Sequence, residues 1–104
     1  MEQYIYEDKT NNHITINVIN NIVYIKKYNV DSLHGKLFVV MLKKAFLDAT
    51  KYGCTKYRQT IYIDEYEKLT TKDDWNVINK NDYTIELECD IDIAAILIIN
   101  EFIT

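Results

Sequence analysis

The fold is decided by HITINVINNIVYIKKYNVDSLHGKLFVVMLKKAFLDATKYG, residues 13–53. The first part alternates apolar and polar residues over 13–18 and is β-branched and aromatic over 22–28, which predicts two strands. Between them Asn20-Asn21 supplies residues that tolerate positive φ. The pattern therefore predicts a β-hairpin.

The second part of this stretch predicts a long helix over residues 33–52. Asp31-Ser32 can cap its start, and Gly53 suits the left-handed position after its end. At helical spacing one side is apolar and forms the expected core face, made of Phe38, Leu42, Ala45, Phe46 and Ala49.

Strands are also expected at residues 3–7, 58–64 and 83–89, a short helix at 72–80 behind a Thr71/Asp74 capping pattern, and a last helix at 91–103. Apolar residues surround the last helix, so it must be buried or lie at an interface. The prediction is one α/β or α+β domain over residues 1–104. Its sheet is mixed, with four to five strands, and the helices lie largely on one face.

The net charge of −4 is unevenly distributed along the chain. Residues 33–52 carry four Lys and one Asp, whereas residues 61–104 carry three Lys and eleven acids. With a single Arg in the chain, this balance argues against direct nucleic-acid binding. The abundance of Ile, Lys, Asn and Tyr indicates an A/T-rich coding genome, such as that of a virus, a mobile element or a low-GC microbe.

Neither end nor any apolar run predicts export or membrane insertion, and Cys54 and Cys89 form no CxxC pair. We therefore expect reduced thiols in a cytoplasmic protein.

The candidate chemical groups have plainer interpretations. Asp31-Ser32 beside His34 is better explained as a helix cap than as a nucleophile with its base. Glu86, Glu88, Asp90 and Asp92 would line one face if their strand continued, as hard cations prefer, but no calcium loop accompanies them. The two His residues, His13 and His34, have no ligand spacing, and two Gly cannot form a phosphate loop. We expect no cofactor, no metal site and no catalytic residue.

Residues 21–75 resemble the STAS-like domains related to sporulation anti-sigma antagonists. The resemblance lies in the strand at 22–25, the helix at 36–52 with Gly53, the strand at 60–64 and the segment LTTKDDW at 69–75. It implies a small α/β domain that binds proteins or small ligands without catalysis. The phosphorylated Ser of those antagonists has no counterpart in the matching stretch 68–72.

An apolar line flanked by lysines is the strongest candidate for an interaction surface. Leu33, Val40 and Leu47 recur every seven residues opposite the core face, and such a line suits an acidic, apolar partner. The full predicted surface is Leu33, Lys36, Val40, Lys43, Lys44, Leu47, Lys51, Glu86, Glu88, Asp90 and Asp92. The leading functional prediction is a non-enzymatic module that binds a protein partner, first of all a second copy of itself in a homodimer. The alternatives are an acidic inhibitor or immunity-type protein on a basic site of a nucleic-acid enzyme, and a small-ligand or lipid carrier.

Overall fold

The computed structural model describes residues 1–103 and contains a six-stranded sheet with three α-helices. In chain order the elements are β1 (Glu2–Glu7), β2 (His13–Ile19), β3 (Ile22–Asn29), α1 (Gly35–Lys51), β4 (Lys56–Tyr62), α2 (Ile63–Glu67), a 3₁₀ turn (Lys72–Asp74), β5 (Asn76–Lys80), β6 (Thr84–Asp90) and α3 (Ile91–Ile103).

The sheet is mixed, with strand order β1-β2-β3-β4-β6-β5. All neighbours are antiparallel except β3 and β4, which α1 connects as a crossover. The predicted hairpin turn is confirmed, since Asn20 and Asn21 have φ of 50° and 65°. The predicted class, a small single α/β domain with a mixed sheet, is confirmed, although the sheet has six strands instead of four to five.

Helix α1 packs its predicted face on the sheet. Phe38, Leu42, Ala45, Phe46 and Ala49 are all buried, against Ile14, Ile16 and Val23 of the hairpin. Gly53 ends the helix with φ of 88°, a backbone conformation that side chains with a Cβ adopt at a cost.

Three local predictions were wrong. Residues 72–80 form a 3₁₀ turn and then β5, because Val77 lies opposite Leu87 of β6 across a tight loop, with the β-branched Ile78 as an extra residue at a register shift. The strand at 58–64 ends at Tyr62, where α2 begins. The N-cap of α1 is His34 without a side-chain hydrogen bond, while the Asp31 carboxylate instead accepts the N–H of Leu33 at 2.8 Å.

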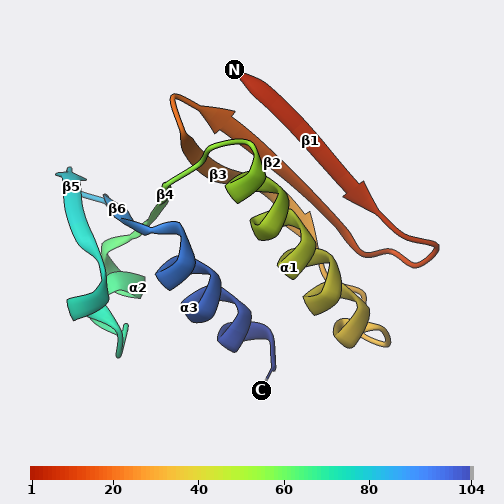
Figure 1. The fold of residues 1–104 in the computed structure, drawn as a ribbon. Helices are drawn as coiled ribbons and strands as arrows, with labels where there is room; N and C mark the ends of the chain where they lie inside the picture. Colours follow the sequence, from red (N-terminus) through yellow and green to blue (C-terminus); the bar gives the residue numbers. More distant parts are fainter. Residues whose placement is uncertain (104) are drawn as a thin grey trace.

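Helices α1 and α3 lie side by side on the same face of the sheet (Figure 1). Ile91, Ala94 and Ile98 of α3 are buried in the core, whereas Ile96 on its other side is 63% exposed. No helix among residues 1–103 is both long and apolar enough to cross a membrane.

The loops before β2 and before α1 are fastened together by Asn12, which is 1% exposed. Its side-chain amide donates to Oδ2 of Asp8 at 3.2 Å and to the carbonyl of His34 at 2.9 Å, and its Oδ1 accepts the N–H of Asp31 at 2.7 Å. A buried side chain that satisfies groups in two loops fixes their relative position.

We predict that Asn12→Ala lowers the free energy of unfolding by about 1–3 kcal/mol, because it leaves the Asp31 N–H without its acceptor and removes one of the donors to the His34 carbonyl. Urea unfolding followed by circular dichroism measures the change. Asn11→Ala is the matched control, since Asn11 is exposed and engages through its backbone only. Equal midpoints for the two variants would contradict this role of Asn12.

Candidate functional site

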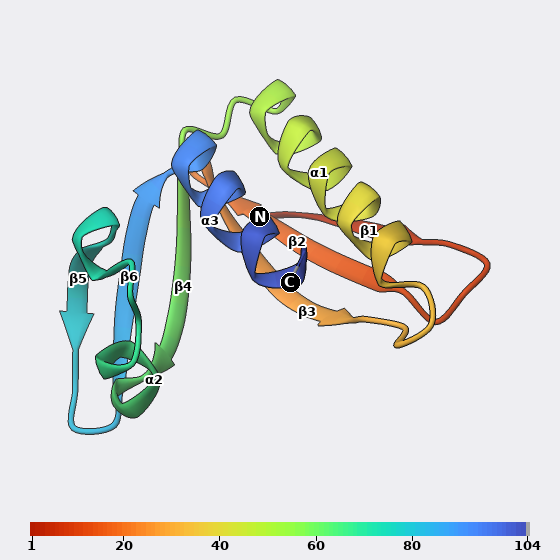
Figure 2. The ribbon, with the colours of Figure 1, turned by 90° about the horizontal axis from the view of Figure 1, so that it is seen from below.

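Strands β3 and β4 separate after a very short contact. They pair in parallel only over Ile22–Tyr24 with Lys56–Arg58. Beyond that point β3 continues to Asn29 and β4 to Tyr62, and Figure 2 shows them diverging from a common origin with α3 between them. On the edges that face each other, the backbone groups of residues 25–29 and 59–62 therefore have no strand partner within the described chain. Such groups can pair with an extended ligand.

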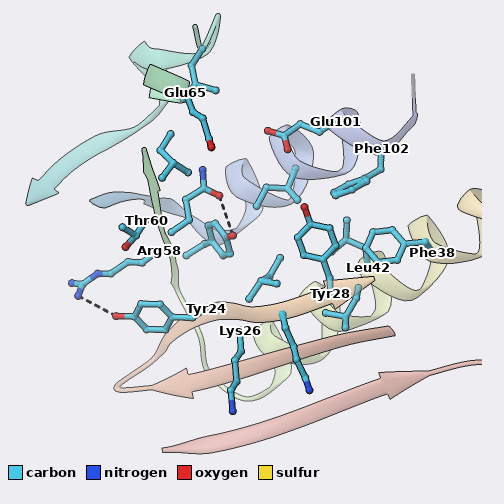
Figure 3. A pocket seen from close by; sticks show the side chains of 18 residues that line it. Tyr24, Lys26, Tyr28, Phe38, Leu42, Arg58, Thr60, Glu65, Glu101 and Phe102 are labelled. Carbon is cyan, nitrogen blue, oxygen red and sulfur yellow. Dashed lines mark hydrogen bonds between the residues drawn. The ribbon is translucent and has the colours of Figure 1, made fainter. Parts of the chain in front are cut away.

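The space between the two strands is a cavity of about 730 Å³. Its apolar wall comes from both halves of the sheet and both long helices, with Ile25, Phe38, Leu42, Ile61 and Ile98 among its lining residues. Figure 3 shows the side chains converging on this space. An apolar cleft with few polar groups is the usual form of a small-molecule site.

A β-bulge lies in β3 beside the cleft. Ile16 of β2 is opposite Ile25, but the next residue back, Thr15, is opposite Lys27, so Lys26 is the extra residue. A bulge bends its strand and re-aims backbone groups, and bulges are frequent next to active sites. Here it lies where β3 leaves β4.

Polar side chains also line the cleft, among them Tyr57, Gln59, Glu65 and Glu101. The others are Tyr24, Lys26, Lys27, Tyr28, Arg58 and Thr60. The hydroxyl of Tyr57 donates to Oε1 of Gln59 at 3.2 Å, and burial raises the Tyr57 pKa, so this phenol keeps its proton at neutral pH. Glu101 is exposed as a residue, but partial desolvation of its carboxyl raises its pKa, and it belongs to none of the ion pairs of residues 1–103. Glu65 and Glu101 approach the cavity from α2 and α3 (Figure 3).

One end of the cleft reaches the first turn of α1, where Tyr28, Phe38 and Phe102 form an aromatic cluster with ring centroids 4.9–5.9 Å apart. The loop before that turn is occupied by the Asp31 carboxylate. It accepts the N–H groups of Leu33 and Asn11 and lies 3.0 Å from Nδ1 of His34, and these hydrogen bonds lower its pKa. The loop before α1 therefore carries a negative charge. A phosphate bound at the start of this helix would instead need hydrogen-bond donors there.

The basic part of the predicted interaction surface is exposed on α1 and the loop before it. Leu33, Val40 and Leu47 are 87%, 64% and 57% exposed. Lys36, Lys43, Lys44 and Lys51 are exposed as well, and Lys44 is 3.5 Å from Asp48.

The acidic part of that surface is divided. Glu88 accepts a hydrogen bond from Nε of Arg58 at 2.6 Å, Glu86 lies 3.9 Å from the same guanidinium, and Asp90 pairs with Lys56. Asp92 leaves this row because β6 ends at Asp90 and α3 begins at Ile91. Three of these acids therefore neutralise the basic side chains of β4, Lys56 and Arg58.

Other candidate groups stay apart. Cys54 and Cys89 are free and buried, and burial raises the pKa of Cys89 to about 11, so neither is an activated nucleophile. Within residues 1–103 no cluster of His, Cys, Asp and Glu could hold a metal ion. The ring of His34 contacts the Asp31 carboxylate and not Ser32, so these residues fasten the loop and do not form a nucleophile with its base.

Solved structures with the same fold are N-acetyltransferases. The PaiA N-acetyltransferase of Thermoplasma acidophilum, solved in complex with coenzyme A, matches with a TM-score of 0.61 and 15% identity over 86% of this chain and 62% of that one. An acetyltransferase of Bacillus cereus matches with a TM-score of 0.58 and 13% identity, over 86% of this chain and 73% of that one.

The ribosomal-protein-S18-alanine N-acetyltransferase of Escherichia coli matches with a TM-score of 0.53 and 12% identity, over 77% of this chain and 61% of that one. The fold is that of the N-acetyltransferases. This chain spans about three fifths of the length of the first and third of these proteins. No protein-family model and no curated protein matches the sequence.

These comparisons correct the family and the function predicted from the sequence. The resemblance to STAS-like domains was wrong, because the structures that share this fold are acetyltransferases. The resemblance rested on three short segments, a strand, a helix and a strand. Such segments occur in both folds, and they carry no sign that β3 and β4 separate. The same neighbours overturn the non-enzymatic predictions, namely the interaction module, the inhibitor and the carrier, because the solved structures that share this fold are themselves acetyltransferases.

The sequence patterns single out none of the cleft residues as functional, although they place Phe38 and Leu42 in the core. Tyr57 and Gln59 of β4 lie more than forty residues before Glu101 of α3, and they share one cavity only because β3 and β4 separate. The available signal was the adjacent pair Lys26-Lys27, which interrupts the β-branched and aromatic run over 22–28 at the bulge.

Proposed function

We propose that this chain transfers an acyl group from a thioester to an amine, with the donor lying in the cleft between β3 and β4. The observation that carries the proposal is the three-residue contact between these strands, beyond which both expose unpaired backbone edges to an apolar cavity. The shared fold with acetyltransferases, one of them solved with coenzyme A, supports it.

The part of coenzyme A that fits the cleft is its thioester arm. An extended chain of amides and methylenes can pair with the open edges of residues 25–29 and 59–62 and lie on the apolar wall. The nucleotide end is less well suited, because the loop between the cleft residues Tyr28 and Phe38 carries the ionised Asp31 carboxylate, which already accepts the N–H groups of Leu33 and Asn11.

A thioester supplies an acyl carbon bonded to a good leaving group, and in the transfer a carbon–nitrogen bond forms as the carbon–sulfur bond breaks. Glu101 takes a proton from the incoming ammonium, for which its raised pKa is suited. Tyr57 holds its proton at neutral pH and gives it to the departing sulfur. The second excess proton of the attacking nitrogen passes to the Tyr57 phenolate as the amide forms, and Glu101 releases its proton to water, so both groups return to their starting states. Backbone N–H groups of the bulged strand polarise the carbonyl.

A cytoplasmic location is consistent with this proposal, since both cysteines are free thiols.

A tryptophan in the cleft should block the donor. We predict that Ile61→Trp weakens binding of acetyl-pantetheine by about tenfold or more, measured by calorimetry, because Ile61 lines the cavity. Tyr62→Trp is the matched control on the same strand, since Tyr62 is 65% exposed and its side chain lies outside the cavity lining. Equal affinity of wild type and Ile61→Trp, with both folded, would refute the proposed site.

The role of Glu101 predicts a pH profile. Because burial raises its pKa, kcat/KM should rise with pH through a value above the ordinary range of a glutamate, where the ionised base becomes available. We predict that Glu101→Gln removes this rise and lowers kcat about 100-fold. The assay is thiol release from acetyl-pantetheine in the presence of a panel of primary amines. Glu67→Gln, exposed on α2, is the control. An unchanged profile in Glu101→Gln would assign the proton to another group.

A further inference from the structure

The cleft and the α1 surface suit a donor that is larger than a free cofactor. An extended thioester arm suits the space between β3 and β4, but in the loop between the cleft residues Tyr28 and Phe38 the Asp31 carboxylate already accepts the N–H groups of Leu33 and Asn11. Of the four N–H groups at the start of α1, those of His34 and Leu37 are bonded to the carbonyls of Asp31 and His34, so among the described residues those of Gly35 and Lys36 are left for a ligand. This is enough for a single phosphate but not for the several phosphates of coenzyme A.

The exposed surface of α1 and of the loop before it is both basic and apolar. Leu33 lies in the loop itself at 87% exposure, and Val40 and Leu47 extend the line along α1, on the side away from the sheet. Four lysines, Lys36, Lys43, Lys44 and Lys51, flank the line, and among the described residues only Lys44 has an acidic partner. An uncompensated row of this kind favours an acidic partner with an apolar strip.

A second copy of this chain is a poorer complement. Two α1 surfaces facing each other would bring lysines together, and like charges repel. The acids of β6 that could have served, Glu86, Glu88 and Asp90, are already paired with Arg58 and Lys56.

We propose that the acyl donor is delivered by an acidic carrier protein whose acyl group is attached to a phosphopantetheine arm. The carrier docks on the α1 surface, its single phosphate lies at the start of α1, and its arm enters the cleft past Tyr28 and Phe38. This inference rests on the proposed function, because it names the donor for the same cleft.

The test is binding of an acidic acyl carrier protein, prepared with and without its acetyl-phosphopantetheine arm and labelled for fluorescence anisotropy. The acetylated carrier should bind the wild type about tenfold more tightly than acetyl-coenzyme A does, and affinity should fall as salt rises. The double change Lys43→Glu with Lys44→Glu should weaken carrier binding about tenfold or more and leave acetyl-pantetheine binding unchanged. The control is Lys9→Glu with Lys80→Glu, which makes the same charge change at exposed positions outside α1.

A further variant tests the effect of the negative charge in the loop before α1. Asp31→Asn removes the negative charge and should tighten acetyl-coenzyme A binding about threefold or more while acetyl-pantetheine binding stays the same. Circular dichroism of every variant establishes that it is folded.

The outcomes separate the two proposals. If acetyl-pantetheine binds the wild type and is blocked by Ile61→Trp, but the carrier binds no more tightly than acetyl-coenzyme A, the cleft stands and the carrier proposal is refuted. If acetyl-pantetheine does not bind in the cleft, the proposed function itself fails. If the lysine reversals leave carrier binding unchanged but turn a dimer into a monomer in light scattering, the α1 surface belongs to a second copy, and the carrier proposal is again refuted.

Discussion

Three residues of parallel pairing between β3 and β4 hold the two halves of the sheet together, and the rest of the structure depends on that short contact. One half consists of β1, β2 and β3 under α1, and the other of β4, β6 and β5. Because the strands separate at once, the backbone N–H and C=O groups on their open edges need hydrogen-bond partners from outside the sheet. Helix α3 bridges part of the opening, with Ile98 in the core and Phe102 packed on Phe38 and Tyr28. The remaining space is the cleft on which the proposed chemistry rests.

The distribution of charged side chains limits which ligand such a cleft could bind. The acids of β6 are used to neutralise Arg58 and Lys56, so they stabilise the central strands and are unavailable for a partner. Asp31 fastens two loops, and its charge lies in the loop before α1, between the cleft residues Tyr28 and Phe38. The lysines of α1 are left largely unpaired, which makes the helix the natural place for an acidic partner.

Local sequence patterns predicted much of the fold and little of the site. The hairpin, α1, β6 and α3 were predictable because periodicity and turn residues such as Asn20-Asn21 and Gly53 act over short distances. β5 was not, because the capping pattern at Thr71 and Asp74 outweighed the β-branched pair that follows, and pairing with β6 decided the outcome. The cleft was out of reach since it arises from how far β3 and β4 pair, which no spacing along the chain records. Tyr57 and Glu101 therefore looked like an ordinary strand residue and an ordinary helix residue.

The central claim, that a thioester arm lies between β3 and β4, is tested most directly by NMR. The ¹⁵N-labelled protein would be titrated with a thioether analogue of acetyl-pantetheine, which cannot transfer its acyl group. The account predicts shifts in the backbone amides of residues 25–29 and 59–62, whose edges face the cleft, and little change in β1 or β5 at the sheet edges. Saturable shifts confined to other elements, or none at all at millimolar analogue, would contradict it.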